Sequence, residues 1–186
     1  MTLTRPDHAS PWVLDTRKLG RRAGAMQRIQ LSVPTDDRIG IDLIAVPAGA
    51  EFDLDLRLES VTEGIWVSGS ASATAQGQCS RCLTDLAQPV VAQLRDLYVY
   101  PGSTTDRTTD TDELPRVDDD LLDLQPLVRD EIVLALPLAP VCRPECPGLC
   151  PDCGERLDDL EPDHRHEILD PRWAGLRDRF GSAETN

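Results

Sequence analysis

The six cysteines of this chain are its clearest chemical feature, because they fall into three closely spaced pairs. The pairs are Cys79 with Cys82, Cys142 with Cys146, and Cys150 with Cys153. A gap of two or three residues lets both thiolates of a pair bind one tetrahedral zinc ion, and a structural zinc site closes with four ligands. We therefore predict that the first two pairs share one zinc ion.

A second metal site is predicted around the third pair. Gly154 follows Cys153 directly, and glycine at positive φ suits the tight turn of a zinc knuckle. His164 and His166 come later, and alternate residues of an extended chain face the same way. Two thiolates and two imidazoles also complete a tetrahedral zinc site. The second predicted ligand set is Cys150, Cys153, His164 and His166.

Other interpretations of these residues stay open at the level of sequence. Cysteines can be small buried side chains, although three pairs beside glycine, proline and charged residues are not typical of that role. Cys79 and Cys82 could form a redox pair, but no βαβ pattern follows them. His164 and His166 could lie in a solvated turn, because acidic residues flank them.

A catalytic zinc site would need an open position for water and a nearby carboxylate base. The eight predicted ligands close two sites and leave no such position. Asp152 and Glu167 are candidate bases only if one ligand is misassigned. Cys146 and Cys150 are close enough in sequence to exchange between the sites, so spacing leaves the partition open. We expect two structural Zn²⁺ ions and no catalysis.

The elements that must position these ligands follow from hydrophobic periodicity. Apolar and polar residues alternate along 52–61, as in an antiparallel strand with one wet face. Strand patterns also cover 28–34, 65–78 and 83–100, the last two on either side of the first cysteine pair. Residues 124–138 have helical spacing between prolines. These patterns predict an α+β fold: a mainly antiparallel sheet, or a partly open barrel, with one packed helix and a zinc-binding C-terminal segment.

Composition divides the chain into a larger and a smaller part. We assign the β-rich part and its helix to 1–140. Within it, 101–120 is rich in threonine, aspartate, glycine and proline without periodicity, which predicts a mobile acidic loop. The zinc-binding segment is assigned to 141–186, with a short final helix over about 170–180.

Charge is distributed unevenly along the chain. The formal net charge of −14 opposes non-specific attraction to phosphate backbones. Residues 1–30 nevertheless hold six basic residues against two acidic ones, whereas 104–131 hold ten acidic against three basic. The two regions are suited to different partners. A DNA-binding regulator is disfavoured, because the charge is negative and no basic recognition helix is found.

The sequence shows neither a secretory signal nor a membrane span. The first ten residues lack a positive region followed by an apolar one, and no stretch approaches the roughly 20 apolar residues of a spanning helix. We therefore expect a cytoplasmic protein. In a reducing cytoplasm, closely spaced cysteines are metal ligands more often than disulfides.

An ordered set of motifs runs along the chain: Trp-Val-Leu-Asp from residue 12 through Pro34, the knuckle 79–82, the helix 124–138, the cysteine-rich run 142–154, and Asp-Pro-Arg-Trp at 170–173. This set resembles the YceD family of large-subunit ribosomal RNA accumulation proteins, in its actinobacterial-type form. The resemblance implies a role in accumulation of the large-subunit ribosomal RNA through ribosome assembly, linked to a small zinc-ribbon ribosomal protein.

The resemblance adds partners and a function to these expectations. We expect a non-enzymatic factor that supports accumulation of the large-subunit (23S) ribosomal RNA; the alternative is a zinc-dependent hydrolase acting on RNA. Many family members carry Cys-x-Cys where this chain has His164-Arg165-His166, a replacement that keeps tetrahedral coordination. The acidic loop is expected to engage a basic ribosomal protein. The residues expected to touch ribosomal RNA or assembly intermediates are Arg17, Lys18, Arg21 and Arg22.

The first site would be rich in negative charge, because all four of its predicted ligands are thiolates. Arg81 and Arg143 stand next to those ligands in the sequence. We expect these two arginines to offset the excess charge.

Overall fold

The structure is a computed structural model that describes residues 9–109 and 114–166. Its helices are α1 (Thr104–Thr108), α2 (Gln125–Ala135) and a 3-10 turn, Leu157–Asp159. Its strands are β1 (Val13–Asp15), β2 (Met26–Pro34), β3 (Ile39–Gly40), β4 (Ile44–Val46), β5 (Glu51–Val61), β6 (Gly64–Gln78), β7 (Asp85–Val99) and β8 (Leu121–Asp123).

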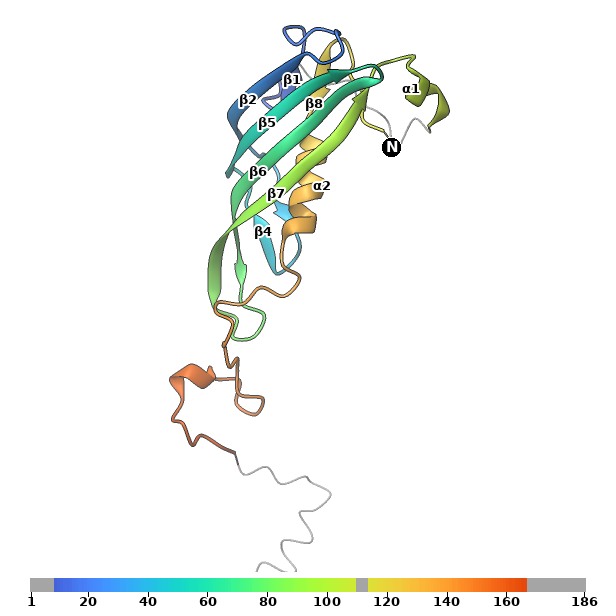
Figure 1. The fold of residues 1–186 in the computed structure, drawn as a ribbon. Coiled ribbons are helices and arrows are strands. Elements are labelled where there is room, and N and C mark those ends of the chain that lie inside the picture. Colours follow the sequence, from blue (N-terminus) through green and yellow to red (C-terminus); the bar gives the residue numbers. More distant parts are fainter. Residues whose placement is uncertain (1–8, 110–113, 167–186) are drawn as a thin grey trace, which may run out of the picture.

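Six of these strands form one long antiparallel sheet (Figure 1). The strand order is β2-β5-β6-β4-β3, in which β5 and β4 pair with successive parts of one edge of β6. β7 pairs with the opposite edge of β6. The path ends at β2 and β3, so the sheet is open and does not close into a barrel. The predicted fold class, a mainly antiparallel sheet with one packed helix, is confirmed.

Alternation of apolar and polar side chains explains the long strands. In β5, Phe52, Leu54, Leu56 and Leu58 are buried, while the residues between them face solvent or lie near the surface. β6 and β7 have 15 residues each and pair over their whole length. The connection between them, 79–84, carries the first cysteine pair at the far end of the hairpin.

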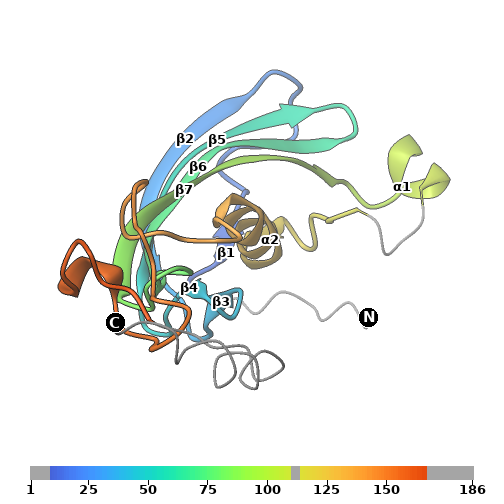
Figure 2. The same ribbon diagram turned by 90° about the horizontal axis from the view of Figure 1, so that it is seen from below.

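The sheet curves around α2, which lies on its concave side (Figure 2). Gly69 of β6 permits a close approach of β5, because a Cβ atom there would stand 2.1 Å from the carbonyl oxygen of Asp55. Its φ of +154° is also a conformation that other residues rarely adopt. The concave side holds the apolar core.

Helix α2 is shorter than the predicted span of 124–138. It ends at Ala135, because Leu136 takes an extended conformation before Pro137. Leu127, Val128 and Ile132 of this helix are buried in the apolar core. Among the described residues, α2 is the longest helix, and none has the length and apolar character of a membrane span.

Several short elements were not predicted. β1 pairs with β8, although more than one hundred residues separate them in sequence. The stretch 101–120, predicted to be a mobile acidic loop, contains α1, and its Arg116 forms an isolated bridge with Val99 at the end of β7. Ser103 caps α1 by accepting a hydrogen bond from the Asp106 amide, a local signal in a sequence without apolar periodicity. The predicted final helix lies outside the described residues.

Candidate metal centres

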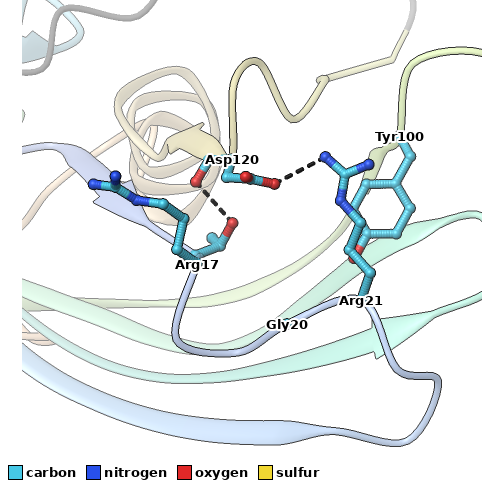
Figure 3. Close-up of a pocket in the computed structure, with 6 residues that line it drawn as sticks. Arg17, Gly20, Arg21, Tyr100 and Asp120 are labelled. Atoms are coloured by element: carbon cyan, nitrogen blue, oxygen red, sulfur yellow. Dashed lines mark hydrogen bonds and ion pairs between the residues drawn. The ribbon is translucent and has the colours of Figure 1, made fainter.

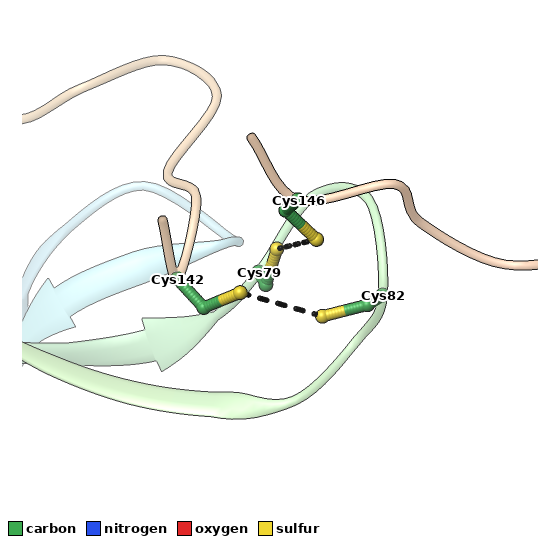
Figure 4. A group of neighbouring side chains, drawn as sticks. All are labelled: Cys79, Cys82, Cys142 and Cys146. Atoms are coloured by element: carbon green, nitrogen blue, oxygen red, sulfur yellow. Dashed lines mark hydrogen bonds between the residues drawn. The ribbon is translucent and has the colours of Figure 1, made fainter. Parts of the chain in front are cut away.

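The first two cysteine pairs meet at the end of the sheet (Figure 4). Cys79 and Cys82 come from the β6–β7 connection, and Cys142 and Cys146 follow α2. Their four sulfur atoms lie within 4.8 Å of one another. Cys79 Sγ is 3.8 Å from Cys146 Sγ, and Cys82 Sγ is 3.7 Å from Cys142 Sγ.

These separations fit one tetrahedral ion. A Zn–S bond of about 2.3 Å places the corners of a tetrahedron about 3.8 Å apart. A disulfide would bring two sulfurs to about 2.05 Å, and all six cysteines are free. Cys79, Cys82 and Cys146 are buried, whereas Cys142 is exposed. The cluster therefore has the donor set and the spacing of a closed structural metal site.

Backbone hydrogen bonds hold the first knuckle in shape. The Leu83 amide donates to the Cys79 carbonyl at 2.9 Å, and the Cys79 amide donates to the Thr84 carbonyl at 2.8 Å. Leu83 has a φ of +57°, which the tight turn requires. The Ser80 amide donates to the Pro140 carbonyl at 2.8 Å and ties the knuckle to the segment that follows α2.

Arg81 joins the two halves of this site. Its guanidinium donates to the carbonyls of Pro144 and Cys146 at 3.2 and 3.0 Å. Sequence reasoning assigned Arg81 a charge role only; its carbonyl partners come from a loop about sixty residues away. Arg143, the other arginine expected to offset charge, forms an ion pair with Asp158. That ion pair raises the pKa of Arg143 through its hydrogen bond.

The thiols of the first site differ in acidity. Burial raises the pKa of Cys79, but amide hydrogen bonds led by that of Cys82 outweigh burial and lower it to about 6. The side-chain hydrogen bond with Thr84 lowers the pKa of Cys82. Burial raises the pKa of Cys146 to about 12, and the neighbouring thiols add to the effect. Four adjacent thiolates repel one another, so full ionisation favours a bound cation.

A second cluster contains Cys150, Cys153, His164 and His166, whose ligand atoms also lie within 4.8 Å of one another. Gly154 has a φ of +75° and donates to the Cys150 carbonyl at 2.9 Å, which closes the knuckle. The amide of Cys153 lowers the pKa of the Cys150 thiol. Cys153 and His166 are exposed, so this cluster is more open to solvent than the first.

The second cluster fits a tetrahedral ion less closely. Cys153 Sγ stands 3.6 Å from His164 Nε2, the separation expected of sulfur and nitrogen on one zinc ion, about 3.6 Å. The Nε2 atoms of His164 and His166 are 2.7 Å apart, a hydrogen-bonding distance. Two nitrogens on one tetrahedral zinc ion would stand about 3.3 Å apart, so the imidazoles would have to separate slightly.

The structure describes one of the two candidate bases. Asp152 is exposed in the turn between Cys150 and Cys153. Glu167 lies outside the described residues. The two clusters contain the eight predicted ligands, grouped as the predicted sets.

Two of the four basic residues expected at an RNA interface pair within the protein, and Figure 3 shows one of them, Arg21, next to Asp120. Arg17 hydrogen-bonds to Asp15, and this contact lowers the pKa of the Asp15 carboxyl to about 2. Arg21 pairs with Asp120 at 2.9 Å and lies over the Tyr100 ring, 5.0 Å from its centre.

The remaining basic residues of this loop, Lys18 and Arg22, are exposed. A small cavity of about 140 Å³ is lined by residues of this loop, Tyr100 and Asp120. Sequence reasoning did not find this arrangement, because Asp120 reaches the loop only through the pairing of β1 with β8.

An open antiparallel sheet, one packed helix and two cysteine-containing ligand clusters define an α+β protein able to hold metal ions. Comparison with known families then places the sequence. The chain belongs to the YceD family, described as "Large ribosomal RNA subunit accumulation protein YceD", which matches residues 67–178, more than half of the chain. The matched region includes most of β6, all of β7 and α2, and both clusters.

Relatives extend the similarity toward the N-terminus. Uncharacterized protein Rv2926c of Mycobacterium tuberculosis is 50% identical over 173 residues, which cover 93% of this chain and 83% of the relative. Uncharacterized protein ML1660 of Mycobacterium leprae is 44% identical, over 91% of this chain and 77% of the relative. Uncharacterized protein YlbN of Bacillus subtilis is 28% identical, over 66% and 67%. No solved structure matches the chain significantly.

Proposed function

We propose that this protein is a non-enzymatic factor that supports accumulation of the large-subunit (23S) ribosomal RNA in the cytoplasm. The observation that carries the proposal is the family match over 67–178, a region that contains both ligand clusters. The family is described by its role in large ribosomal RNA subunit accumulation.

The proposed metal role is structural. The sulfurs of Cys79, Cys82, Cys142 and Cys146 would hold one Zn²⁺, and the cluster that contains Cys150 and the two histidines would hold another. Four protein ligands on each ion leave no position for a reacting water molecule. Zinc would then rigidify the end of the sheet and the segment after α2.

The proposed partners follow from charge. Lys18 and Arg22 are exposed and suited to phosphate contacts, while Arg17 and Arg21 become available when their exposed ion pairs open. The acidic residues of 104–131 are suited to a basic ribosomal protein.

Depletion of the protein from its native cells tests the function. We expect the ratio of 23S to 16S ribosomal RNA to fall, and large-subunit precursors to collect in sucrose gradients. Wild-type protein should restore the ratio, whereas the Cys79→Ser variant should not. An unchanged ratio after complete depletion would contradict the proposal.

The alternative is a zinc-dependent hydrolase acting on RNA. The exposure of Cys153 and His166 and the short separation of the two imidazoles are the observations that favour it. X-ray absorption at the zinc edge of the purified protein separates the two functions. Sulfur and nitrogen ligands alone support a structural role, while an oxygen ligand together with metal-dependent RNA cleavage supports the hydrolase.

A further inference from the structure

The outer face of the sheet, opposite α2, carries a row of arginines that the metal clusters do not use. Strand register places Arg28 of β2 beside Arg57 of β5, Arg57 beside Ser68 of β6, and Ser68 beside Arg95 of β7. The side chains of Arg28 and Arg57 are 79% and 57% exposed, and Arg95 is exposed as well. Strands about 4.8 Å apart therefore present three guanidinium groups along one line.

An exposed indole lies next to this arginine row. Trp66 is two residues before Ser68 on β6, and 39% of it is exposed. In the register it stands between Glu59 and Leu97. Arg57 and Arg95 are its diagonal neighbours on either side, a separation of about 7–8 Å that long side chains can bridge.

The carboxylates that pair with these arginines compete only weakly with an external anion. Arg28 contacts Asp55 at 3.5 Å, and Arg57 contacts Glu59 at 3.3 Å. All four side chains are at least one-third exposed, and solvent and salt screen such pairs. A phosphate can form a bidentate, charge-assisted pair with arginine in their place.

The adjacent part of the same face carries acidic instead of basic side chains. A shallow hollow of about 410 Å³ lies over β2, β5 and β6, with Asp53 and Asp55 in its lining beside serines and Gln30. Carboxylates accept hydrogen bonds and repel phosphate. The hollow therefore confines a polyanion to the arginine row and the indole.

The basic loop before β2 lies at the same end of the sheet. The Gly24 amide donates to the Ser60 carbonyl at 2.8 Å, and the Ser60 amide donates to the Ala25 carbonyl at 2.9 Å. These bonds fix the loop that contains Arg22 next to the turn between β5 and β6. Trp66 is in the first residues of β6, so the indole lies at the same end of the sheet as this loop.

We propose that Arg28, Arg57, Arg95 and Trp66 form a binding surface for single-stranded RNA. The guanidinium groups contact phosphates, and the indole stacks on an unpaired base, as aromatic residues on open β-sheets do in other RNA-binding modules. An acidic peptide would satisfy the arginines but would not use the indole. This inference rests on the proposed function and names the surface and the form of RNA that it takes.

Fluorescence anisotropy with a labelled, unstructured RNA oligonucleotide tests the surface, using the full-length, metal-loaded protein over a series of salt concentrations. The triple variant Arg28→Ala, Arg57→Ala, Arg95→Ala should flatten the slope of log K against log salt by about 2, because three phosphate contacts on a single strand are lost. Trp66→Ala should weaken binding about tenfold, and Trp66→Phe should restore most of it. Circular dichroism verifies that each variant is folded.

Two further variants make the test specific. Arg129→Ala removes an exposed arginine from α2, on the other side of the sheet, and should leave binding unchanged. Asp55→Asn removes the carboxylate that contacts Arg28 and should tighten binding. An effect of Arg129→Ala equal to that of a single arginine in the row would contradict a local surface.

Three results would overturn the inference: no RNA binding by the wild type, wild-type affinity of the triple variant, or stronger competition by polyglutamate than by RNA. Expression of the triple variant in depleted cells separates this inference from the proposed function. If depletion lowers 23S ribosomal RNA and the triple variant restores it fully, the surface is wrong and the function stands. If depletion has no effect, the function itself is wrong.

Discussion

Individual side chains decide whether the first cluster can hold two distant segments of the chain together around one metal ion. Its sulfurs come from two segments about sixty residues apart, yet they stand at the separations of a tetrahedron. Metal affinity then depends on how firmly the protein holds those segments before the ion binds. Arg81 is the side chain that connects them.

Replacement of Arg81 should therefore lower metal affinity. We expect Arg81→Ala to weaken binding at the first cluster about 10- to 100-fold, as loss of a supporting hydrogen bond does at other metal sites. Competition with a chromogenic chelator measures the change. Arg143→Ala is the matched control, because it removes an adjacent positive charge that bonds to Asp158 instead. Equal losses in the two variants would mean that charge, not positioning, is responsible.

A partly buried carboxylate in β7 predicts a pH dependence of stability. Burial raises the pKa of Asp96, although the Leu97 amide donates to its Oδ1 at 2.7 Å. A raised pKa in the folded state means that folding disfavours the charged form. The resulting loss of stability is absent below the unfolded pKa of about 3.9, grows as pH rises toward the folded pKa, and is complete above it.

Asp96→Asn keeps the oxygen acceptor and removes the charge. We expect this variant to be more stable than the wild type at pH 7, with a difference that disappears toward pH 3. Urea unfolding of both proteins at each pH measures it, and pairwise comparison cancels the shared loss of metal in acid. A wild type that is more stable than Asp96→Asn at pH 7 would refute the argument.

At the scale of elements, β6 organises the sheet. It pairs with β7 along one edge and with β5 and then β4 along the other. A Cβ atom at Gly69 would stand 2.1 Å from the carbonyl oxygen of Asp55 in β5, so glycine lets the two strands approach each other at this point.

Gly69→Ala should destabilise the protein by more than about 2 kcal/mol, because the new Cβ would meet a backbone oxygen that cannot move aside cheaply. Gly49→Ala is the control: its φ is also positive, at +80°, but open space surrounds it. We expect a cost of about 1 kcal/mol there. Thermal unfolding of the metal-loaded proteins measures both losses of stability. Equal losses would show that the positive φ, and not the contact with the backbone oxygen, is responsible.

An element can be predicted from sequence when the residue pattern that specifies it lies within a few consecutive positions. Alternation in 52–61 and the cysteine spacings act within a few residues, so strand β5 and the composition of the ligand clusters could be expected from sequence. The pairing of β1 with β8 depends on contacts between three-residue strands far apart in the chain. Arg28, Arg57 and Arg95 form a row only through the register of four strands, which no local pattern specifies.

At the scale of the whole molecule, the two clusters constrain the chain differently. The first joins the β6–β7 hairpin to the segment after α2, and its buried sulfurs pack against Leu86, Val141 and Leu149. The second closes a short loop within 150–166. Cross-linking distant segments restricts the unfolded chain more than closing a short loop does.

Loss of the first ion should therefore unfold more of the protein than loss of the second. We expect Cys79→Ser and Cys150→Ser each to lower the metal content by one ion per chain, measured by mass spectrometry. The metal-binding free energy of a structural site is folding free energy. Cys79→Ser should thus lower the unfolding temperature of the sheet strongly and expose amides of the β6–β7 hairpin to hydrogen exchange.

Cys150→Ser should leave the exchange of that hairpin unchanged and affect only the segment that follows residue 146, because no sheet strand supplies a ligand to the second cluster. His164→Ala provides an independent check of the same cluster. Equal protection of the hairpin amides from exchange in all variants would contradict this role of the first cluster, because the end of the sheet would then stay folded without metal. A wild-type protein that is metal-free and fully folded would remove the structural role of both clusters.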